Sequence, residues 1–437
     1  MHDLFINNAR LFEELCTKPR LTSGYLKVRK NQGAAGIDGV SIEDFGNKLD
    51  EELSQLLKEL VDWTYRPKAV KAVEIPKPGS NTDKRRLGIP CVRDRVVQAA
   101  IKELIEPILE PTFSDNSYGF RPGRSPHDAV LKAKEIVEQE GKGFVVDLDL
   151  EKFFDKINHD RLIARLGDKI QDKRILRLIG LMLRSGIMKD GVVSSTEVGS
   201  IQGSPLSPLL SNVVLDELDK ELETRGHKFC RFADDCNIFV STYKAAERVM
   251  STITEFIERR LKLKVNAQKS KVAKSKEVKF LGFTIINGKI AIAKAAIDRA
   301  MDKVKILTPR GTHLSTKDSI SQINKWFRGW SSYYSLGQYP AQLAKIEAHI
   351  RRRLRARIVK QQKRRSHLCN KLVKRGISRR AASKVVYSNK GTWRLSHERV
   401  LERAFPNKWF IETLGQVVSS TTKLPHWFDV KTWIRLP

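Results

Sequence analysis

Two adjacent aspartates constrain the fold of this 437-residue chain more than any other feature of its sequence. Asp234 and Asp235 lie between two runs rich in aromatic and β-branched residues, within Lys228–Val240. This pattern predicts a strand, a tight turn that carries the acids, and a second strand. Neighbouring carboxylates repel each other, so a fold either exposes such a pair to solvent or gives it a cation. An isolated pair is usually a solvated turn, so the choice depends on the rest of the sequence.

A second acidic strand favours the interpretation that the aspartate pair binds a cation. The run Phe144–Leu150 is apolar and β-branched, carries Asp147 and Asp149 at alternate positions, and leads into a predicted helix start that contains Asp155. A carboxylate at the end of this strand, beside the pair on the hairpin, could hold two divalent metal ions about 3.5–4 Å apart, as polymerases do for phosphoryl transfer. Oxygen ligands suit Mg²⁺, with Mn²⁺ as a substitute. Asp147 and Asp149 point to the same face of the strand, so alternation does not separate them.

The order of the motifs around these acids resembles that of reverse transcriptases encoded by bacterial group II introns. Phe232–Asp235 is similar to their catalytic Tyr/Phe-Ala-Asp-Asp box, Asp149–Asp160 to their palm motif, and Gln202–Asn212 to the motif at their nucleotide pocket. The resemblance extends over almost the whole chain. It implies an α+β fold: a right-hand polymerase with fingers and palm, an antiparallel palm sheet, and then a basic α-helical thumb or maturase domain.

The resemblance also implies a set of catalytic residues. The family pattern places the first metal ligand at Asp149, with Asp234 and Asp235 as the others. The backbone carbonyl of Leu150 is a further candidate ligand. Phe154 matches the bulky residue that would clash with a ribose 2′-hydroxyl and so favour dNTPs, although ordinary core packing explains a phenylalanine there equally well.

A basic hairpin precedes the acidic strands. The stretches Val73–Gly79 and Lys84–Pro90 predict two short strands joined by a basic turn. Lys and Arg donors on such a hairpin suit the phosphates of an incoming nucleotide, and a solvated basic hairpin has the same pattern. The residues that the resemblance implies for the nucleotide site are Lys77, Arg85 (or Arg86), Gln202 and Lys269.

A large positive charge accompanies these motifs. The chain has 81 Lys and Arg against 50 Asp and Glu, which gives a net charge of +31 at pH 7. Such a surplus repels itself unless a polyanion neutralises it, so nucleic acid is the expected partner and binding should depend strongly on salt. No apolar run is long enough for a transmembrane helix, and the N-terminus lacks the features of a signal peptide. Five scattered cysteines indicate a reducing compartment, so we expect a cytoplasmic protein without a membrane partner.

The last third of the chain is basic and aromatic. Trp326–Tyr334 surrounds Arg328, and Ile350–Arg365 is a predicted helix with nine basic residues in sixteen and no acid. A solvated helix would normally include acids for i,i+4 pairs, so this one predicts a phosphate-tracking face. It resembles domain X, the maturase domain, which in the family binds intron RNA and the template duplex. Arg121 lies in a Tyr-Gly-Phe-Arg-Pro box, and Gly282 lies in a strand that resembles the primer grip. The residues expected to contact nucleic acid are Arg121, Gly282, Arg328, Arg351, Arg352, Arg353, Arg355, Lys363, Arg364 and Arg365.

The sequence predicts three parts: an N-terminal extension (1–60), fingers and palm (61–290), and a helical thumb or maturase domain with a basic C-terminal region (291–437). The scarcity of Cys and His after residue 390 predicts that a zinc- or histidine-based endonuclease domain is absent.

The predicted activity is RNA-directed DNA polymerisation, in which dNTPs are added to a DNA primer on an RNA template. The chain would also bind its group II intron RNA to aid splicing, and a target DNA for retrohoming. Two alternatives stay open at this point. One is a maturase whose polymerase site is vestigial. The other is a domesticated reverse transcriptase that acts in phage defence or DNA repair.

Overall fold

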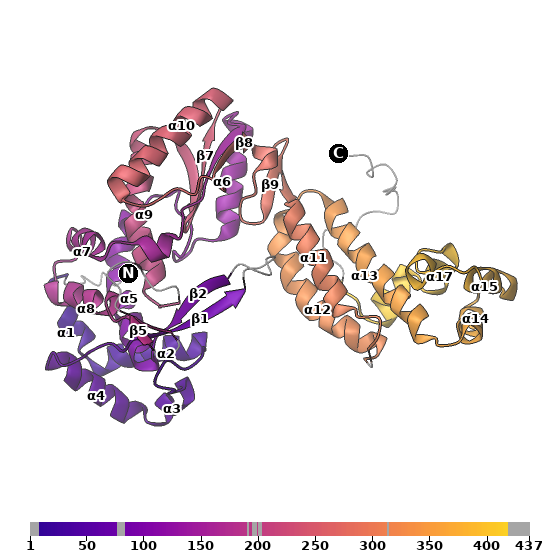
Figure 1. Cartoon of the computed structure of the whole chain (residues 1–437), viewed down its shortest axis with the longest axis horizontal. Coiled ribbons are helices and arrows are strands. Elements are labelled where there is room, and N and C mark those ends of the chain that lie inside the picture. The colour runs from indigo at the N-terminus through magenta and orange to yellow at the C-terminus, as the bar shows by residue number, and fades with distance from the viewer. Residues whose placement is uncertain are drawn as a thin grey trace, which may run out of the picture. The chain divides into compact units, whose positions relative to one another are not determined.

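The computed structural model describes residues 8–76, 84–189, 192–194, 199, 203–312 and 314–417 of the chain. The chain divides into two compact units, Met1–Val278 and Lys279–Pro437, whose elements are labelled in Figure 1. Each unit has its own buried apolar core. The three parts predicted from the sequence, with boundaries at residues 60 and 290, stay a prediction.

The first sheet of the first unit carries the predicted basic hairpin. Strand β1 (Val70–Pro76) pairs antiparallel with β2 (Lys84–Ile89) and parallel with β4 (Ile187–Lys189), which pairs with β5 (Val192–Ser194). The strand order is β2-β1-β4-β5. The two strands expected around the basic turn are therefore confirmed. The helices in this part of the chain are α1 (Leu11–Leu15), α2 (Lys18–Asn31), α3 (Ile42–Asn47), α4 (Leu49–Val61) and α5 (Val92–Leu109).

The second sheet carries the acidic residues. Its strands are β3 (Phe144–Leu148), β6 (Lys228–Phe232), β7 (Asp235–Val240) and β8 (Lys271–Lys274). They are antiparallel throughout, in the order β6-β7-β3-β8. β6 and β7 form the predicted hairpin, with Phe232 opposite Asp235 across a two-residue turn. The predicted antiparallel palm sheet is confirmed.

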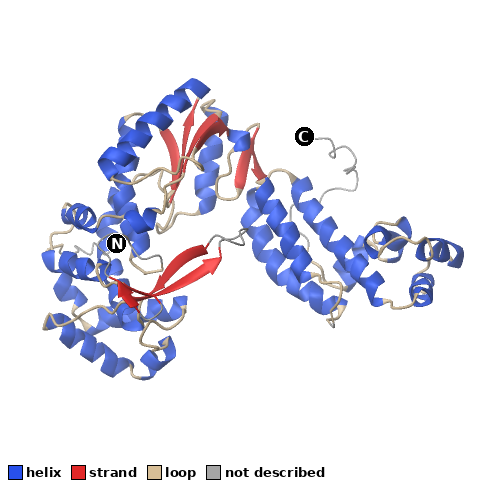
Figure 2. Ribbon diagram, in the orientation of Figure 1, coloured by secondary structure: helices blue, strands red, loops and turns tan. Residues whose placement is uncertain are grey.

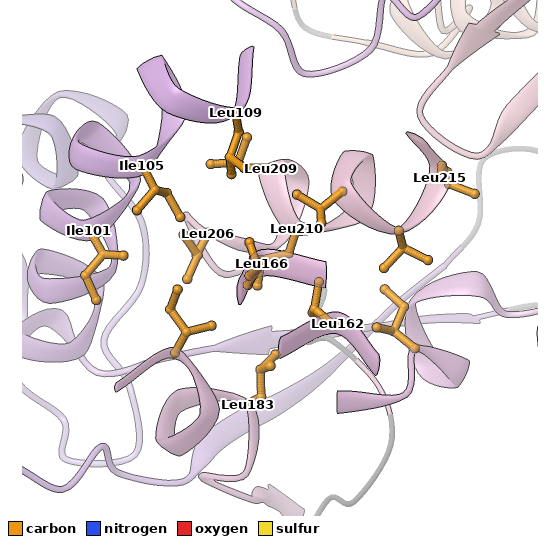
Figure 3. Close-up of a cluster of buried hydrophobic side chains, with 14 of the residues drawn as sticks. Ile101, Ile105, Leu109, Leu162, Leu166, Leu183, Leu206, Leu209, Leu210 and Leu215 are labelled. Carbon is orange, nitrogen blue, oxygen red and sulfur yellow. The ribbon is translucent and has the colours of Figure 1, made fainter. Parts of the chain in front are cut away.

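Helices cover this sheet and build the core beside it. Helices α6 (Pro126–Gln139) and α10 (Tyr243–Phe256) pack against the palm strands. Figure 3 shows leucine and isoleucine side chains of α5, α7 (His159–Gly167), α8 (Lys173–Leu183) and α9 (Ser207–Thr224) meeting in one cluster. Leu162, Leu166 and Ile101 in that cluster are fully buried. The palm sheet and the sheet that contains β1 and β2 thus belong to one unit with a common helical core.

The second unit is almost entirely helical apart from one hairpin, as Figure 2 shows. The hairpin is made by β9 (Phe283–Ile286) and β10 (Lys289–Ile292). Aromatic rings at the end of α12 pack on it, since the ring centroid of Phe283 lies 5.7 Å from that of Tyr333, the last residue of α12, and 5.1 Å from that of Tyr334, which follows it. Within the described residues, no helix is both long and apolar enough to span a membrane. The helices are α11 (Lys294–Leu307), α12 (Thr316–Tyr333), α13 (Pro340–Gln361), α14 (Arg365–Val373), α15 (Arg379–Val386), α16 (Thr392–Leu395) and α17 (Arg399–Ala404).

Candidate active site

The pairing of β3 with β7 brings the predicted catalytic acids to one end of the palm sheet. The last pair in this ladder is Leu148 with Cys236. The next residue after Leu148 is Asp149, and the residue before Cys236 is Asp235, so both lie at the same end of the ladder. Asp234 precedes Asp235 in the turn and is half-buried, whereas Asp235 is exposed.

A loop after α10 fixes the backbone of Asp149. The amide of Asn266 donates a hydrogen bond to the Asp149 carbonyl at 2.8 Å, and the Asp149 amide donates to the Ser270 hydroxyl at 3.0 Å. Leu150 is buried and forms a bridge with Val265 of the same segment. Lys269, which the sequence predicts for the nucleotide site, lies in this loop between Asn266 and Ser270, and its side chain is exposed. No motif in the sequence indicated the roles of Asn266 and Ser270.

The two competing acids occupy different positions. Asp147 is inside the sheet, opposite Asn237 of β7 and Lys271 of β8. Asp155 belongs to a short 3₁₀ helix, Phe153–Lys156, beyond the strand. Of the three, Asp149 alone follows directly after the last residue of β3, at the end of the ladder where the hairpin turn lies, which favours it as the partner of the Asp-Asp pair.

The donor chemistry of this site fits a hard divalent cation. Asp149, Asp234 and Asp235 offer only oxygen atoms, the donor type that Mg²⁺ and Mn²⁺ prefer. In the part of the chain that the structure describes, no three His, Cys, Asp or Glu side chains are gathered closely enough to hold a metal ion as they stand. Carboxylates repel one another, and a cation is what draws such a set together. The backbone therefore juxtaposes the three acids, whereas the two-ion arrangement stays a prediction.

A close backbone approach braces the turn that carries the acids. Ala233 has a φ of +57°, a left-handed conformation that is uncommon outside glycine. Gly119 packs directly on it, because a Cβ atom at this position would lie 2.2 Å from the Ala233 nitrogen. The rings of Phe120 and Phe232 lie 6.4 Å apart beside the same turn. The Tyr-Gly-Phe-Arg-Pro box therefore supports the hairpin that carries Asp234 and Asp235.

Arg121 in this box is turned into the protein. Its side chain is 4% exposed, with Nε donating to the Glu110 carboxylate at 2.8 Å and Nη1 donating to the carbonyls of Ser117, at 2.9 Å, and Ser114. A guanidinium whose donors are engaged in this way is not available to a phosphate. The expectation that Arg121 contacts nucleic acid is therefore corrected: it holds the loop that supports the hairpin.

The predicted nucleotide residues are only partly described. Lys77 and Gln202 lie outside the described residues, and Arg85 is placed by its backbone in β2, opposite Ile75. The residue after Gln202 is Gly203, whose φ is +118° and where a Cβ would lie 2.4 Å from the Gly88 carbonyl oxygen of β2. This contact joins the pocket motif to the basic hairpin.

Ser204 and Phe154 extend this region. The buried Ser204 hydroxyl donates to Gln98 Oε1 of α5 at 2.9 Å, and no motif indicated Gln98. Phe154 is half-buried in the 3₁₀ helix, with its ring 5.2 Å from that of Phe153 and packed against the core. Its suggested selection against ribose stays a prediction.

The stretch predicted as one basic helix, 350–365, spans the end of α13 and the start of α14, and three of its arginines, Arg351, Arg355 and Arg357, are buried. Arg355 is buried, donates from Nε to the Phe405 carbonyl at 2.9 Å, and has its pKa lowered to about 10 by burial. Arg351 is 9% exposed beside Glu347, and Arg353 donates to the Thr308 carbonyl at 2.8 Å. Glu347 in the preceding turn of α13, together with carbonyls elsewhere in the chain, provides partners for these arginines.

This burial corrects the predicted phosphate-tracking face for Arg351 and Arg355. Arg351 and Arg355 belong to the packing of the second unit, and Arg353 is partly engaged in it. Gly282, predicted to contact the primer backbone, packs instead against a side chain of the protein, since a Cβ there would lie 2.6 Å from the Tyr334 hydroxyl. The predicted basic residues whose side chains are exposed are Arg328, Arg352, Lys363, Arg364 and Arg365.

Comparison with known proteins identifies the chain's family. Residues 75–285 match the family described as reverse transcriptase (RNA-dependent DNA polymerase), and residues 297–375 match the group II intron, maturase-specific domain. Protein YkfC of Escherichia coli (strain K12) is 32% identical over 299 residues, which make up 59% of this chain and 78% of YkfC. This chain belongs to the group II intron reverse transcriptase family. The predicted fold and the polymerase domain joined to a maturase domain are thereby confirmed.

Two further similarities cover smaller shares. The group II intron-encoded protein LtrA of Lactococcus lactis subsp. cremoris is 35% identical over 222 residues, which make up 51% of this chain but only 36% of LtrA. Among solved structures, a partial Cas6-RT-Cas1--Cas2 complex has a TM-score of 0.37 and 23% identity, and covers 57% of this chain and 42% of that chain. A likeness of that size supports no inference about this chain's site.

Gly119→Ala should disturb the catalytic hairpin. The added Cβ meets backbone atoms of the turn rather than a flexible side chain. We expect a loss of stability of about 1–3 kcal/mol from overpacking, and primer extension slowed by at least about tenfold. The matched control is Gly143→Ala, where a Cβ meets no atom within 4 Å. Wild-type stability and extension rate in Gly119→Ala would contradict the close approach described above.

Proposed function

We propose that this chain extends a DNA primer on an RNA template, with Asp149, Asp234 and Asp235 as its catalytic acids. The observation that carries the proposal is the register of β3 and β7, which brings these acids to one end of the sheet. The match of residues 75–285 to the reverse transcriptase family supports it independently. When bound at these carboxylates, two Mg²⁺ ions, or Mn²⁺ in their place, would supply charge neutralisation and a lowered pKa for the primer hydroxyl.

The protein's own contribution is positioning. Rigid strands and the loop anchored through Asn266 and Ser270 hold Asp149, and the braced turn holds the acid pair. Fixing reactive groups in this way lowers a barrier because no reorganisation is needed during the reaction. The residues proposed to hold and select the incoming dNTP are Lys77, Arg85, Gln202, Lys269 and Phe154, with the Leu150 carbonyl as a further metal ligand.

We propose a second role in binding the group II intron RNA. The match of residues 297–375 to the maturase-specific domain supports this role. The net charge of +31 favours a polyanionic partner, and exposed basic residues remain on the second unit after the buried arginines are set aside. The residues proposed for this surface are Arg328, Arg352, Lys363, Arg364 and Arg365. Intron splicing and insertion into a target DNA are the processes that this binding would serve, and the five free thiols fit the cytoplasm as the location.

Asp234→Ala should separate polymerisation from RNA binding. Removing one carboxylate of the pair should slow primer extension by more than about 100-fold, because charge stabilisation at the reacting phosphate is lost. RNA affinity should change by less than about twofold, since phosphate contacts by basic residues dominate it. The assay is extension of a DNA primer on an RNA template beside a filter-binding titration. Asp62→Ala, which removes an exposed aspartate at the end of α4, is the control. Extension by Asp234→Ala at the wild-type rate would refute the catalytic assignment.

Replacing Lys363, Arg364 and Arg365 together with alanine should weaken binding of the intron RNA. If each contacts one phosphate of a single-stranded segment, the slope of log K against log salt should fall by about 2, from about 0.7 per contact. The control is Arg259→Ala, whose guanidinium is 2.8 Å from Glu255 in an i,i+4 pair. A slope equal to that of the wild type would mean that this cluster is only a solvated surface.

A further inference from the structure

A fully buried ion pair lies beneath the turn that carries Asp234 and Asp235. Arg231, on β6, and Asp219, on α9, are both 0% exposed, and they form a two-pronged pair with Nε–Oδ1 at 2.7 Å and Nη2–Oδ2 at 2.5 Å. Burial by itself lowers the pKa of Arg231, but the charge and hydrogen bonds of Asp219 outweigh that effect and raise it. The guanidinium therefore stays charged inside the protein.

Every N–H group of this guanidinium has an acceptor. Beside the two bonds to Asp219, Nη2 donates to the Ser117 hydroxyl at 2.7 Å. Nη1 donates to Asn212 Oδ1 at 3.1 Å and to the Ala233 carbonyl at 2.9 Å. An arginine has five such donors in a fixed planar fork, so this set leaves none unused. The Arg231 guanidinium thus bonds to three parts of the first unit: α9, the loop before Gly119, and the turn that carries Asp234.

One of these bonds acts on the acids themselves. The Ala233 carbonyl belongs to the peptide group that joins Ala233 to Asp234, so holding its oxygen fixes the plane from which the Asp234 backbone starts. Ala233 is in the left-handed region at a φ of +57°, a conformation that persists only where the surroundings impose it. The other four donors anchor the guanidinium to elements outside the hairpin, and this fifth bond transmits that anchoring to the turn.

Stability alone does not explain such a pair. Replacing a buried ion pair by apolar side chains of similar volume is often neutral or stabilising, because the charges no longer have to be desolvated. A planar, multiply bonded cation does hold its partners in one geometry, which an apolar contact would leave loose.

We propose that Arg231, anchored by Asp219, is a positioning residue that holds the Ala233 carbonyl so that the turn presents Asp234 and Asp235 in their metal-binding orientation. The inference rests on the proposed catalytic role of these aspartates. It concerns a buried residue that touches neither the nucleotide nor the reacting atoms.

The decisive variant is the double replacement Arg231→Met with Asp219→Leu. It removes the hydrogen bond to Ala233 without leaving a buried charge unpaired, so the protein should fold with a melting temperature close to that of the wild type. Arg231→Lys is the second variant. It keeps a positive charge against Asp219, but an ammonium has only three donors and cannot reproduce the planar fork. Arg357→Met is the matched control, because this guanidinium is also 0% exposed but lies in the second unit and donates to Ser319 and to the Leu314 carbonyl.

Two readouts separate positioning from a structural role. Mn²⁺ titration followed by electron paramagnetic resonance measures metal binding without turnover, and single-turnover primer extension measures the dependence of rate on Mg²⁺. For the double variant and for Arg231→Lys we expect Mn²⁺ affinity and maximal extension rate each to fall by about tenfold or more. Template affinity should be unchanged. Arg357→Met should alter thermal stability alone.

Folded variants with wild-type Mn²⁺ affinity and wild-type Mg²⁺ dependence would overturn the proposal. So would unfolding of both Arg231 variants, because the pair would then be a requirement of folding rather than of positioning. A wild-type protein that does not extend a primer would refute the proposed function, and Mn²⁺ binding would still decide the role of Arg231. Loss of metal binding in the folded variants, with extension by the wild type, is the result that supports it.

Discussion

The antiparallel pairing of β3 with β7 is the constraint on which the candidate site depends. Asp149 follows directly after the last residue of this ladder on β3, and Asp235 precedes the last paired residue on β7, so the ladder brings them to the same end of the sheet. A slip of one residue would turn every side chain of β3 to the other face of the sheet. Val146 of β3 is fully buried opposite the equally buried Ile238 of β7, and such a slip would be costly because it would take Val146 out of this contact. The core packing of the palm thus sets the geometry of its chemistry.

Glycines in or near the family motifs pack against other motifs of the chain. Gly119 lies against the catalytic turn, Gly203 against Gly88 of the basic hairpin, and Gly199, through its amide, donates to the Ile157 carbonyl at 2.8 Å beyond the 3₁₀ helix. Each contact joins segments far apart in the chain. The proposed catalytic acids would depend on such contacts, since catalytic power comes from groups held in place beforehand.

The strands, the acidic hairpin and the basic hairpin could be predicted from the sequence, because alternation and turn residues are local signals. Which arginine side chains point into the protein could not be predicted from the sequence. Arg355 bonds to the carbonyl of Phe405, fifty residues later, and Arg121 bonds to Glu110 in the preceding helix turn. Counting the charges along one predicted helix does not reveal either acceptor, because each lies in another segment of the chain. The same reason hides Asn266 and Ser270, whose partner Asp149 is more than a hundred residues earlier.

The most direct test of the central claim compares Asp149→Asn with Asp147→Asn in primer extension on an RNA template with Mg²⁺. Both replacements keep the size of the side chain and remove one charge, and the two residues share a face of the same strand. The register of β3 and β7 predicts that Asp149→Asn abolishes extension, whereas Asp147→Asn retains most of it. Loss of extension in Asp147→Asn with activity retained in Asp149→Asn would contradict the account of the site.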